Sequence, residues 1–200
     1  MIVVWTAAAF LAGSLMFSYW IGRLKRLNLK TYGDGNPGAI NLWKAAGYGY
    51  GIAGISLDFL KGYLPMLWLH HSGVVTGYWL VLPAAAAILG HICSPFTGWK
   101  GGKAIAVTFG VWSGLTGFSA TLAYAVILAV LLLASRRLEK GSPTSSESDA
   151  FHVVLGMLML TIYLVLDNYD WSYVLLGIVN FLLLAYSHRK ELLGVKGINS

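Results

Sequence analysis

The sequence predicts an all-α membrane protein that forms one domain, crosses the bilayer seven times and is expected to be monomeric. Of the 200 residues, 57% are hydrophobic and only 11% are charged, which is far from the composition of soluble proteins. Several nearly uncharged runs approach or reach the roughly 20 residues that a membrane-spanning helix needs. Cys93 is the only cysteine, so neither an intrachain disulfide nor a cysteine metal cluster is expected.

The seven apolar runs define the expected spans in order. They cover residues 2–22, 49–69, 78–92, 104–115, 118–134, 151–166 and 171–187. The first run has no basic leader and no small-residue cleavage site, so we expect a retained span rather than a signal peptide. The third, fourth and sixth runs are short, and tilted neighbours or a thinned membrane would accommodate them.

The segments between the spans are polar. A glycine-rich loop covers residues 33–38, and a short helix is expected to follow it over residues 39–47. Residues 135–150 are rich in serine and charge, which predicts a cytoplasmic polar linker between the fifth and sixth spans. The whole chain, residues 1–200, is therefore interpreted as a single integral membrane domain.

Apart from Lys61 inside the second span, the lysines and arginines are confined to alternate loops. They occur in segments 23–44, 100–103, 136–140 and 189–196, whereas loops 70–77, 116–117 and 167–170 have none. By the positive-inside rule, the N-terminus lies outside and the C-terminus lies in the cytoplasm. The net charge of +6 then reflects loops that face anionic lipid, and no nucleic-acid partner is expected.

A short segment, residues 98–104, contains three glycines and two lysines between apolar runs. Gly101 and Gly102 would let backbone N–H groups approach a ligand, while Lys100 and Lys103 supply positive charge. The helix expected to follow would direct its N-terminus at the same place, which suits a phosphate or a similar anion. The alternative is a tight turn with lysines that reach toward water.

Two charged residues lie inside the second span. Asp58 and Lys61 are three residues apart, and charges in a span usually face a partner or a wet cavity. The alternative is that they simply pair with each other near the interface. In the predicted topology these residues, the loop with Asn36, the glycine–lysine segment and His188 all share the cytoplasmic face. Their convergence predicts one anion site on that face.

Three segments resemble the motifs of bacterial acyl-phosphate:glycerol-3-phosphate acyltransferases. They are GDGNPGAIN at 33–41, DFLKG at 58–62 and GHICSPFTGWKGGKAIA at 90–106. Their order and spacing, the seven spans and the His188–Arg189 pair match as well, so the resemblance covers nearly the whole chain. It implies a multi-pass enzyme of phospholipid synthesis in the bacterial inner membrane, with its active site facing the cytoplasm.

The implied reaction moves a fatty acyl group from acyl phosphate to the 1-hydroxyl of glycerol 3-phosphate, giving lysophosphatidic acid and phosphate. The resemblance implies no metal and no cofactor, and it makes the two substrates and membrane lipid the expected partners. The residues expected to be catalytic are Asp34, Lys103 and His188. The residues expected to bind substrate are Gly35, Asn36, Gly38, Asn41, Lys44, Asp58, Lys61, Lys100, Gly101 and Gly102. Within that set, Asp58 and Lys61 would buttress the loops, or Lys61 would reach a phosphate.

The chain departs from the usual family pattern where substrate should bind. The family usually has serine where this chain has Asp34 and threonine where it has Ile40. It usually has arginine at the position of Lys44 and asparagine at the position of Glu191. Asp34 would repel a phosphate unless a lysine lay between them, or it would serve as a general base. Three functions therefore remain open: the reaction above, the same fold with another polar acceptor, or a non-catalytic protein that binds lipid or an anion. A transporter should show polar residues in the outer half of its spans or an internal repeat, and this chain shows neither.

Overall fold

The computed structural model describes residues 1–138 and 145–194, and all regular structure in these ranges is helical. This confirms the all-α part of the predicted fold class. Five helical stretches within the described residues are long and apolar enough to cross a membrane, namely Ile2–Leu24, Tyr48–Ser72, Gly77–Thr97, Ser119–Leu138 and Ser146–Leu166. Two further apolar helices, Ile105–Thr116 and Trp171–Ser187, are shorter. These seven stretches follow the order of the seven apolar runs.

The first span is broken, although the sequence predicts one helix over residues 2–22. Helix α1 (Ile2–Ser14) ends before α2 (Phe17–Leu24), and Leu15 between them is extended. The break frees carbonyl groups that must find donors, because lipid offers none. Ser94 Oγ donates to the Ser14 carbonyl over 2.7 Å, and Lys61 Nζ donates to the Leu15 carbonyl. Contacts from distant helices therefore stabilise the interruption.

The middle of the chain contains two short helices, and the second of them packs closely against a long one. Helix α3 (Ala39–Ala46) turns at Gly47 into α4 (Tyr48–Ser72), and α5 (Val81–Ile92) leads through a loop to α6 (Ile105–Thr116). Helices α4 and α6 approach so closely that a Cβ atom at Gly110 would collide with the Phe59 carbonyl, and one at Gly62 with the Val107 carbonyl. Glycine therefore allows the short helix α6 to lie against α4.

Two of the later helices are longer than the sequence predicts. Helix α7 (Ser119–Leu138) and α8 (Ser146–Leu166) extend into the expected linker at 135–150, of which residues 139–144 lie outside the described part of the chain. Ser145 caps α8 by accepting from the Ser148 N–H group over 3.1 Å, and acidic side chains in the first turn favour this end of the helix. Helix α9 (Trp171–Ser187) and the short α10 (Arg189–Leu192) complete the described fold.

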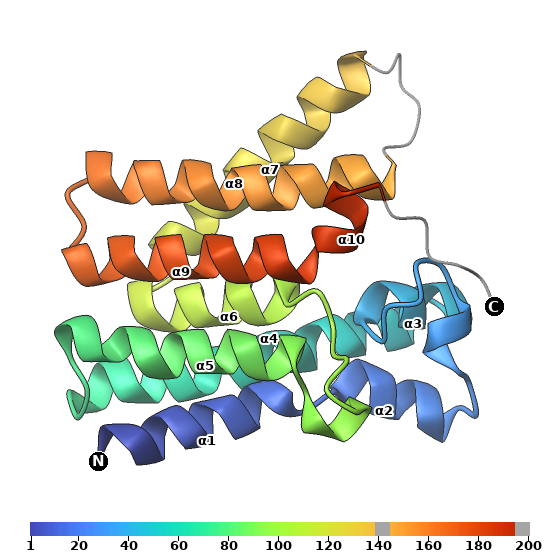
Figure 1. The fold of residues 1–200 in the computed structure, drawn as a ribbon, viewed down its shortest axis with the longest axis horizontal. Helices are drawn as coiled ribbons and strands as arrows, with labels where there is room; N and C mark the ends of the chain where they lie inside the picture. The colour runs from blue at the N-terminus through green and yellow to red at the C-terminus, as the bar shows by residue number, and fades with distance from the viewer. Residues whose placement is uncertain (139–144, 195–200) are drawn as a thin grey trace.

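The two ends of the helix bundle differ in chemistry. Figure 1 shows α2, α3, α10 and the segment before α6 gathered at one end, opposite the N-terminus. The basic segments of the described chain lie at this same end: residues 23–44, the segment before α6, the end of α7 and α10. Large apolar side chains such as Met66, Trp112 and Tyr124 fill the core between the ends.

Candidate functional site

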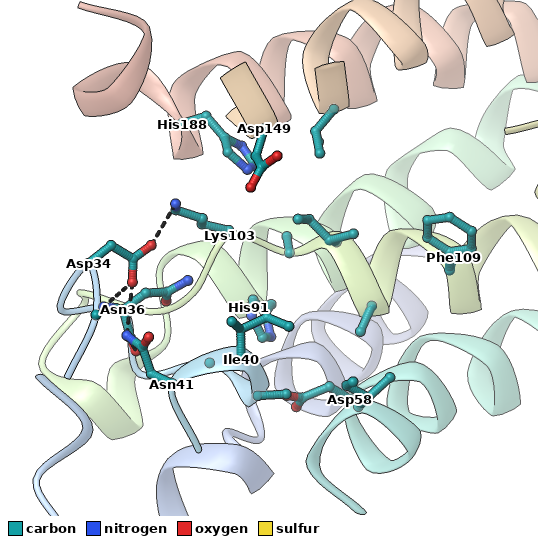
Figure 2. A pocket seen from close by; sticks show the side chains of 18 of the residues that line it. Asp34, Asn36, Ile40, Asn41, Asp58, His91, Lys103, Phe109, Asp149 and His188 are labelled. Atoms are coloured by element: carbon teal, nitrogen blue, oxygen red, sulfur yellow. Dashed lines mark hydrogen bonds and ion pairs between the residues drawn. The ribbon is translucent and has the colours of Figure 1, made fainter. Parts of the chain in front are cut away.

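A cavity of about 1080 Å³ lies at the basic end of the bundle. The loop before α3, the segment before α6 and the start of α10 provide its polar surface, and Figure 2 shows Lys103 between Asp34 on one side and His188 on the other. Helices α4, α6 and α8 provide an apolar wall formed by Ile55, Phe59, Leu60, Ile105, Phe109, Ala150 and Val153. A single cavity therefore offers both a charged region and a hydrophobic one.

The loop of the first motif is folded around its own polar groups. Asp34 Oδ1 accepts from the Asn36 N–H group over 3.1 Å and from Asn41 Nδ2 over 2.8 Å. Asn41 Nδ2 also donates to the Asn36 carbonyl over 2.8 Å, and Asn41 is only 2% exposed. Gly33 has φ +55°, and a side chain there would also collide with Asn41. The loop is thus pre-organised beside the cavity.

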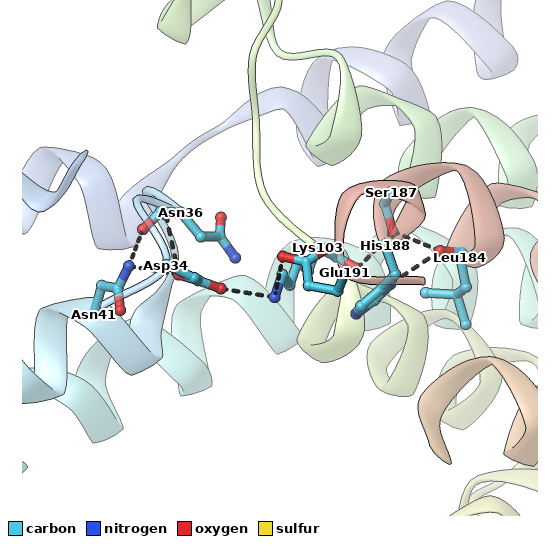
Figure 3. A network of polar contacts seen from close by, with 8 residues as sticks. All are labelled: Asp34, Asn36, Asn41, Lys103, Leu184, Ser187, His188 and Glu191. Atoms are coloured by element: carbon cyan, nitrogen blue, oxygen red, sulfur yellow. Dashed lines mark hydrogen bonds and ion pairs between the residues drawn. The ribbon is translucent and has the colours of Figure 1, made fainter. Parts of the chain in front are cut away.

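Lys103 joins this loop to the C-terminal segment, as Figure 3 shows. Its Nζ lies 2.7 Å from Asp34 Oδ2 and 2.9 Å from Glu191 Oε1. Burial alone would lower the pKa of Lys103, but the two carboxylates raise it above its usual value, so the lysine stays protonated. Burial alone would raise the pKa of Asp34, but Lys103, Asn36 and Asn41 together lower it. Both members of this pair are therefore charged at neutral pH.

One ring nitrogen of His188 is engaged in a hydrogen bond that orients the ring. Its Nδ1 lies 2.9 Å from the Leu184 carbonyl, which can only accept, so the proton of the neutral ring is on Nδ1. Nε2 is then left as an acceptor in a ring that lines the cavity (Figure 2). Burial, reinforced by the charge of Lys103, lowers the pKa of His188 despite the opposing effects of Leu184, Glu191 and Asp34. A neutral imidazole that can take up a proton results.

Two helix N-termini line the same cavity. Helix α3 starts after Gly38 and α6 starts after Ala104, and neither has a side-chain cap. Residues 38–40 and 104–106 belong to the cavity lining. The first N–H groups of a helix have no partner within it, and the helix dipole makes them attractive to anions. The expectation of a helix N-terminus facing the glycine–lysine loop is met at α6, and α3 adds a second.

Asp58 and Lys61 form a buried cluster with residues from three other segments. Lys61 Nζ lies 2.8 Å from Asp58 Oδ1 and 2.7 Å from His91 Nδ1, and it also donates to the Leu15 carbonyl. Asp58 Oδ2 accepts from Ser18 Oγ over 2.7 Å. These three contacts of the Lys61 ammonium are all internal, which favours the buttressing role over contact with a phosphate. Asp58 and His91 nevertheless line the cavity.

The glycine–lysine segment is arranged differently from the sequence expectation. The N–H groups of Gly101 and Gly102 donate over 3.0 Å to the carbonyls of Ile92 and His91, so they do not face a ligand. A Cβ atom at Gly102 would collide with His91 Nε2, which shows why a glycine fits there. Lys100 is exposed and is not part of the cavity lining.

The structure therefore divides the expected site residues into two groups. Eight line the cavity: Asp34, Asn36, Gly38, Asn41, Lys44, Asp58, Lys103 and His188. Five do not: Gly35, Lys61, Lys100, Gly101 and Gly102. The expected site residues did not include Glu191, His91, which the sequence suggests only as a support of the third-motif loop, or the part of the lining that α8 supplies, including Ser146 and Asp149. The departure at Glu191 was visible in the sequence, but nothing there connects it with Lys103.

Comparisons with known proteins agree with this architecture. Residues 3–195 match the family described as glycerol-3-phosphate acyltransferase. Glycerol-3-phosphate acyltransferase 1 of Thermotoga maritima is 38% identical over 187 residues, 92% of each chain. Glycerol-3-phosphate acyltransferase of Aquifex aeolicus is 33% identical over 184 residues, 92% of this chain and 90% of the relative.

Solved structures show the same relationship. A crystal structure of PlsY, an integral membrane glycerol 3-phosphate acyltransferase, in its glycerol 3-phosphate form has a TM-score of 0.82 and 28% identity, covering 98% of this chain and 94% of that one. The lysophosphatidic acid form has a TM-score of 0.80 at 28% identity, covering 98% and 93%. The chain belongs to the glycerol-3-phosphate acyltransferase family, which confirms the resemblance seen in its three motifs.

Proposed function

We propose that this membrane acyltransferase takes a fatty acyl group from acyl phosphate and transfers it to the 1-hydroxyl of glycerol 3-phosphate. The products are lysophosphatidic acid and inorganic phosphate. One observation carries the proposal: two uncapped helix N-termini and the two lysines Lys44 and Lys103 meet in a cavity that also has an apolar wall. Each substrate has a phosphate group for one of these anion sites, and the apolar wall suits a fatty chain.

The two substrates would occupy different parts of the cavity. Acyl phosphate would place its phosphate at the first-motif loop and the start of α3, with its chain along Phe59, Phe109 and Val153. The fatty chain would enter sideways from the lipid between the helices. Glycerol 3-phosphate would bind near Lys103 and His188, which brings its hydroxyl close to the acyl carbonyl carbon.

The chemistry requires positioning and charge more than covalent catalysis. Acyl phosphate is a mixed anhydride and is already activated. The glycerol hydroxyl attacks the carbonyl carbon, His188 Nε2 accepts the hydroxyl proton, the new C–O ester bond forms and the bond to the phosphate oxygen breaks. Lys103 would stabilise the negative charge that develops on the departing phosphate.

Asp34 fits a supporting role better than that of a general base. Both of its carboxylate oxygens already have partners, Oδ1 with two N–H donors and Oδ2 with Lys103. Its lowered pKa also makes it a poor proton acceptor. A lysine does lie beside this carboxylate, which is the condition under which Asp34 is compatible with a nearby phosphate.

The proposed topology has seven spans in one domain, with the N-terminus outside and the cavity facing the cytoplasm. Its support is that the basic segments gather at the end of the bundle that holds the cavity (Figure 1). The short helices α6 and α9 would count as spans because their neighbours tilt or the membrane thins around them. We propose a monomer, and the residues of one chain suffice to line the cavity that the reaction needs.

The direct test uses purified protein in detergent micelles with acyl phosphate and glycerol 3-phosphate. We expect phosphate release together with lysophosphatidic acid, detected by mass spectrometry, and a loss of both in Lys103→Ala. Substitution of acyl-CoA for acyl phosphate should give no product. Wild-type protein that releases no more phosphate than Lys103→Ala would refute the proposed donor and acceptor.

A second candidate is the same reaction with another polar acceptor. It is favoured by Asp34 and Glu191, whose carboxylates offset the positive charge of Lys103 that a phosphate would otherwise meet. An acceptor panel that contains glycerol and other polyol phosphates, run on wild type and Asp34→Ser, separates the two. Faster turnover of another acceptor by wild type, reversed in Asp34→Ser, would support this second candidate.

A further inference from the structure

We propose that Glu191 is a positioning residue, which together with Asp34 clamps the Lys103 ammonium and directs its remaining N–H bond toward a substrate phosphate. The proposal rests on the proposed function, because the phosphate is that of its substrates. In the sequence, Glu191 stands out only as a departure from the usual family pattern.

The geometry of the clamp is that of a cation held from two sides. Lys103 Nζ lies 2.7 Å from Asp34 Oδ2 and 2.9 Å from Glu191 Oε1, and Figure 3 shows it between the two carboxylates. The side chains of Lys103, Asp34 and Glu191 are only 18%, 28% and 16% exposed, so water weakens these pairs less than it weakens pairs on an open surface. An ammonium group has three N–H bonds, and the clamp leaves one for a ligand.

The clamp matters because lysine is a flexible side chain. Its ammonium is a point charge on a four-carbon stem, and it has no fixed direction unless its surroundings supply one. A donor that is already oriented stabilises developing charge without reorganising during the reaction. Two carboxylates from separate segments give Lys103 that fixed direction.

Glu191 also fixes the segment that carries His188. The two residues are three apart at the start of α10, so the bond from Glu191 to Lys103 holds this turn against the segment before α6. Ser187 Oγ donates to the Lys103 carbonyl over 3.3 Å, which is a second tie between the same two segments. Loss of the Glu191 carboxylate would therefore loosen both Lys103 and His188.

The sequence supports treating the two carboxylates as a pair. The residues usual at positions 34 and 191 in the resembling family are serine and asparagine, both of which are neutral. In this chain both positions are acidic, and the structure brings both acids to the same ammonium. Because the two departures have one common partner, we expect their effects on catalysis to be coupled.

Removal of one carboxylate of the clamp should worsen the orientation of Lys103 but raise the affinity for glycerol 3-phosphate. Each carboxylate repels a bound phosphate, so removal of one negative charge should improve binding of glycerol 3-phosphate. The same change frees Lys103 and should slow the chemical step. A residue with a merely structural role would lower kcat without a lower KM.

The experiment measures kcat and KM for glycerol 3-phosphate in full-length wild type, Glu191→Gln, Asp34→Ser and the double variant. For Glu191→Gln we expect kcat to fall by about ten- to a hundredfold and KM to fall by about threefold. The double variant should lose less kcat than the product of the two single losses. Lys190→Gln, an exposed change on the same helix, is the matched control and should leave both constants unchanged.

A second readout follows the clamp without catalysis. An amine-acylating reagent should modify Lys103 about tenfold faster in Glu191→Gln than in wild type, because a clamped ammonium is both shielded and held protonated, and peptide mass spectrometry measures the rate. Glu191→Asn repeats both measurements if Glu191→Gln folds poorly.

The outcomes separate this inference from the proposed function. Wild type without turnover would refute the proposed function, and the positioning role would fall with it. If wild type turns over, three results would each refute the clamp alone. They are unchanged kcat and KM in Glu191→Gln, multiplicative losses of kcat in the double variant, and unchanged labelling of Lys103.

Discussion

Replacement of His188 with glutamine removes the group that we expect to accept the hydroxyl proton. Loss of a general base typically lowers kcat by about a hundred- to ten-thousandfold, or about 3 to 5 kcal/mol of transition-state stabilisation. Glutamine keeps a polar side chain that can donate to the Leu184 carbonyl, so the contact that now orients the imidazole is partly preserved. The loss should therefore appear in kcat more than in thermal stability.

The dependence of kcat on pH tests the same role of His188. Only the neutral imidazole accepts a proton, so wild-type kcat should fall as pH drops through the pKa of His188, which burial holds below the usual histidine value. Activity should consequently remain at its plateau at pH 7 and fall tenfold for each further unit below the midpoint.

The assay is the rate of phosphate release between pH 4.5 and 8 in wild type and His188→Gln. Substrate phosphates also titrate at about pH 6, so the variant is the necessary comparison. A midpoint above the usual histidine value, or an acidic limb of equal depth in His188→Gln, would refute the assignment of His188 as the proton acceptor.

Three further predictions concern the support of the site and its orientation. Gly102→Ala places a methyl group against His91 and should lower stability by about 1 to 3 kcal/mol in thermal unfolding, whereas Gly49→Ala, which meets nothing within 4 Å, should not. Lys61→Met leaves the Asp58 carboxylate buried without its cation and should lower stability by about 3 to 5 kcal/mol; an unfolding temperature equal to that of wild type would contradict the buttressing role. In a Cys93→Ala background, an impermeant thiol reagent should label Gly73→Cys in intact cells but Lys100→Cys only after permeabilisation, and the reverse pattern would overturn the proposed orientation.

The sequence predicted the helical fold and most of the polar cavity because those features are local. Apolar runs mark the helices, and Asp34, Asn36 and Lys103 lie in motifs that are visible in the printed sequence. The break after α1 was not predictable in this way. Neither Leu15 nor Met16 is a helix breaker, and the break is stabilised by Ser94 and Lys61 from other helices.

Other differences have identifiable physical causes. The start of α8 was missed because its polar first turn looks like a linker, although Ser145 with Glu147 and Asp149 after it is a recognisable helix start. The amides of Gly101 and Gly102 were expected to face a ligand, but carbonyls of α5 accept from both. The bond between Lys103 and Glu191 joins residues far apart in the chain, and only the folded arrangement reveals it.

The attachment of Lys103 to residues from both ends of the chain has a consequence for biogenesis. Asp34 leaves the ribosome first of the three, Lys103 later and Glu191 last. The polar end of the cavity is therefore incomplete until α9 has been inserted and α10 has been made. A nascent or prematurely terminated chain contains the early motifs but lacks His188 and Glu191, so catalytic competence should arrive only with completed insertion.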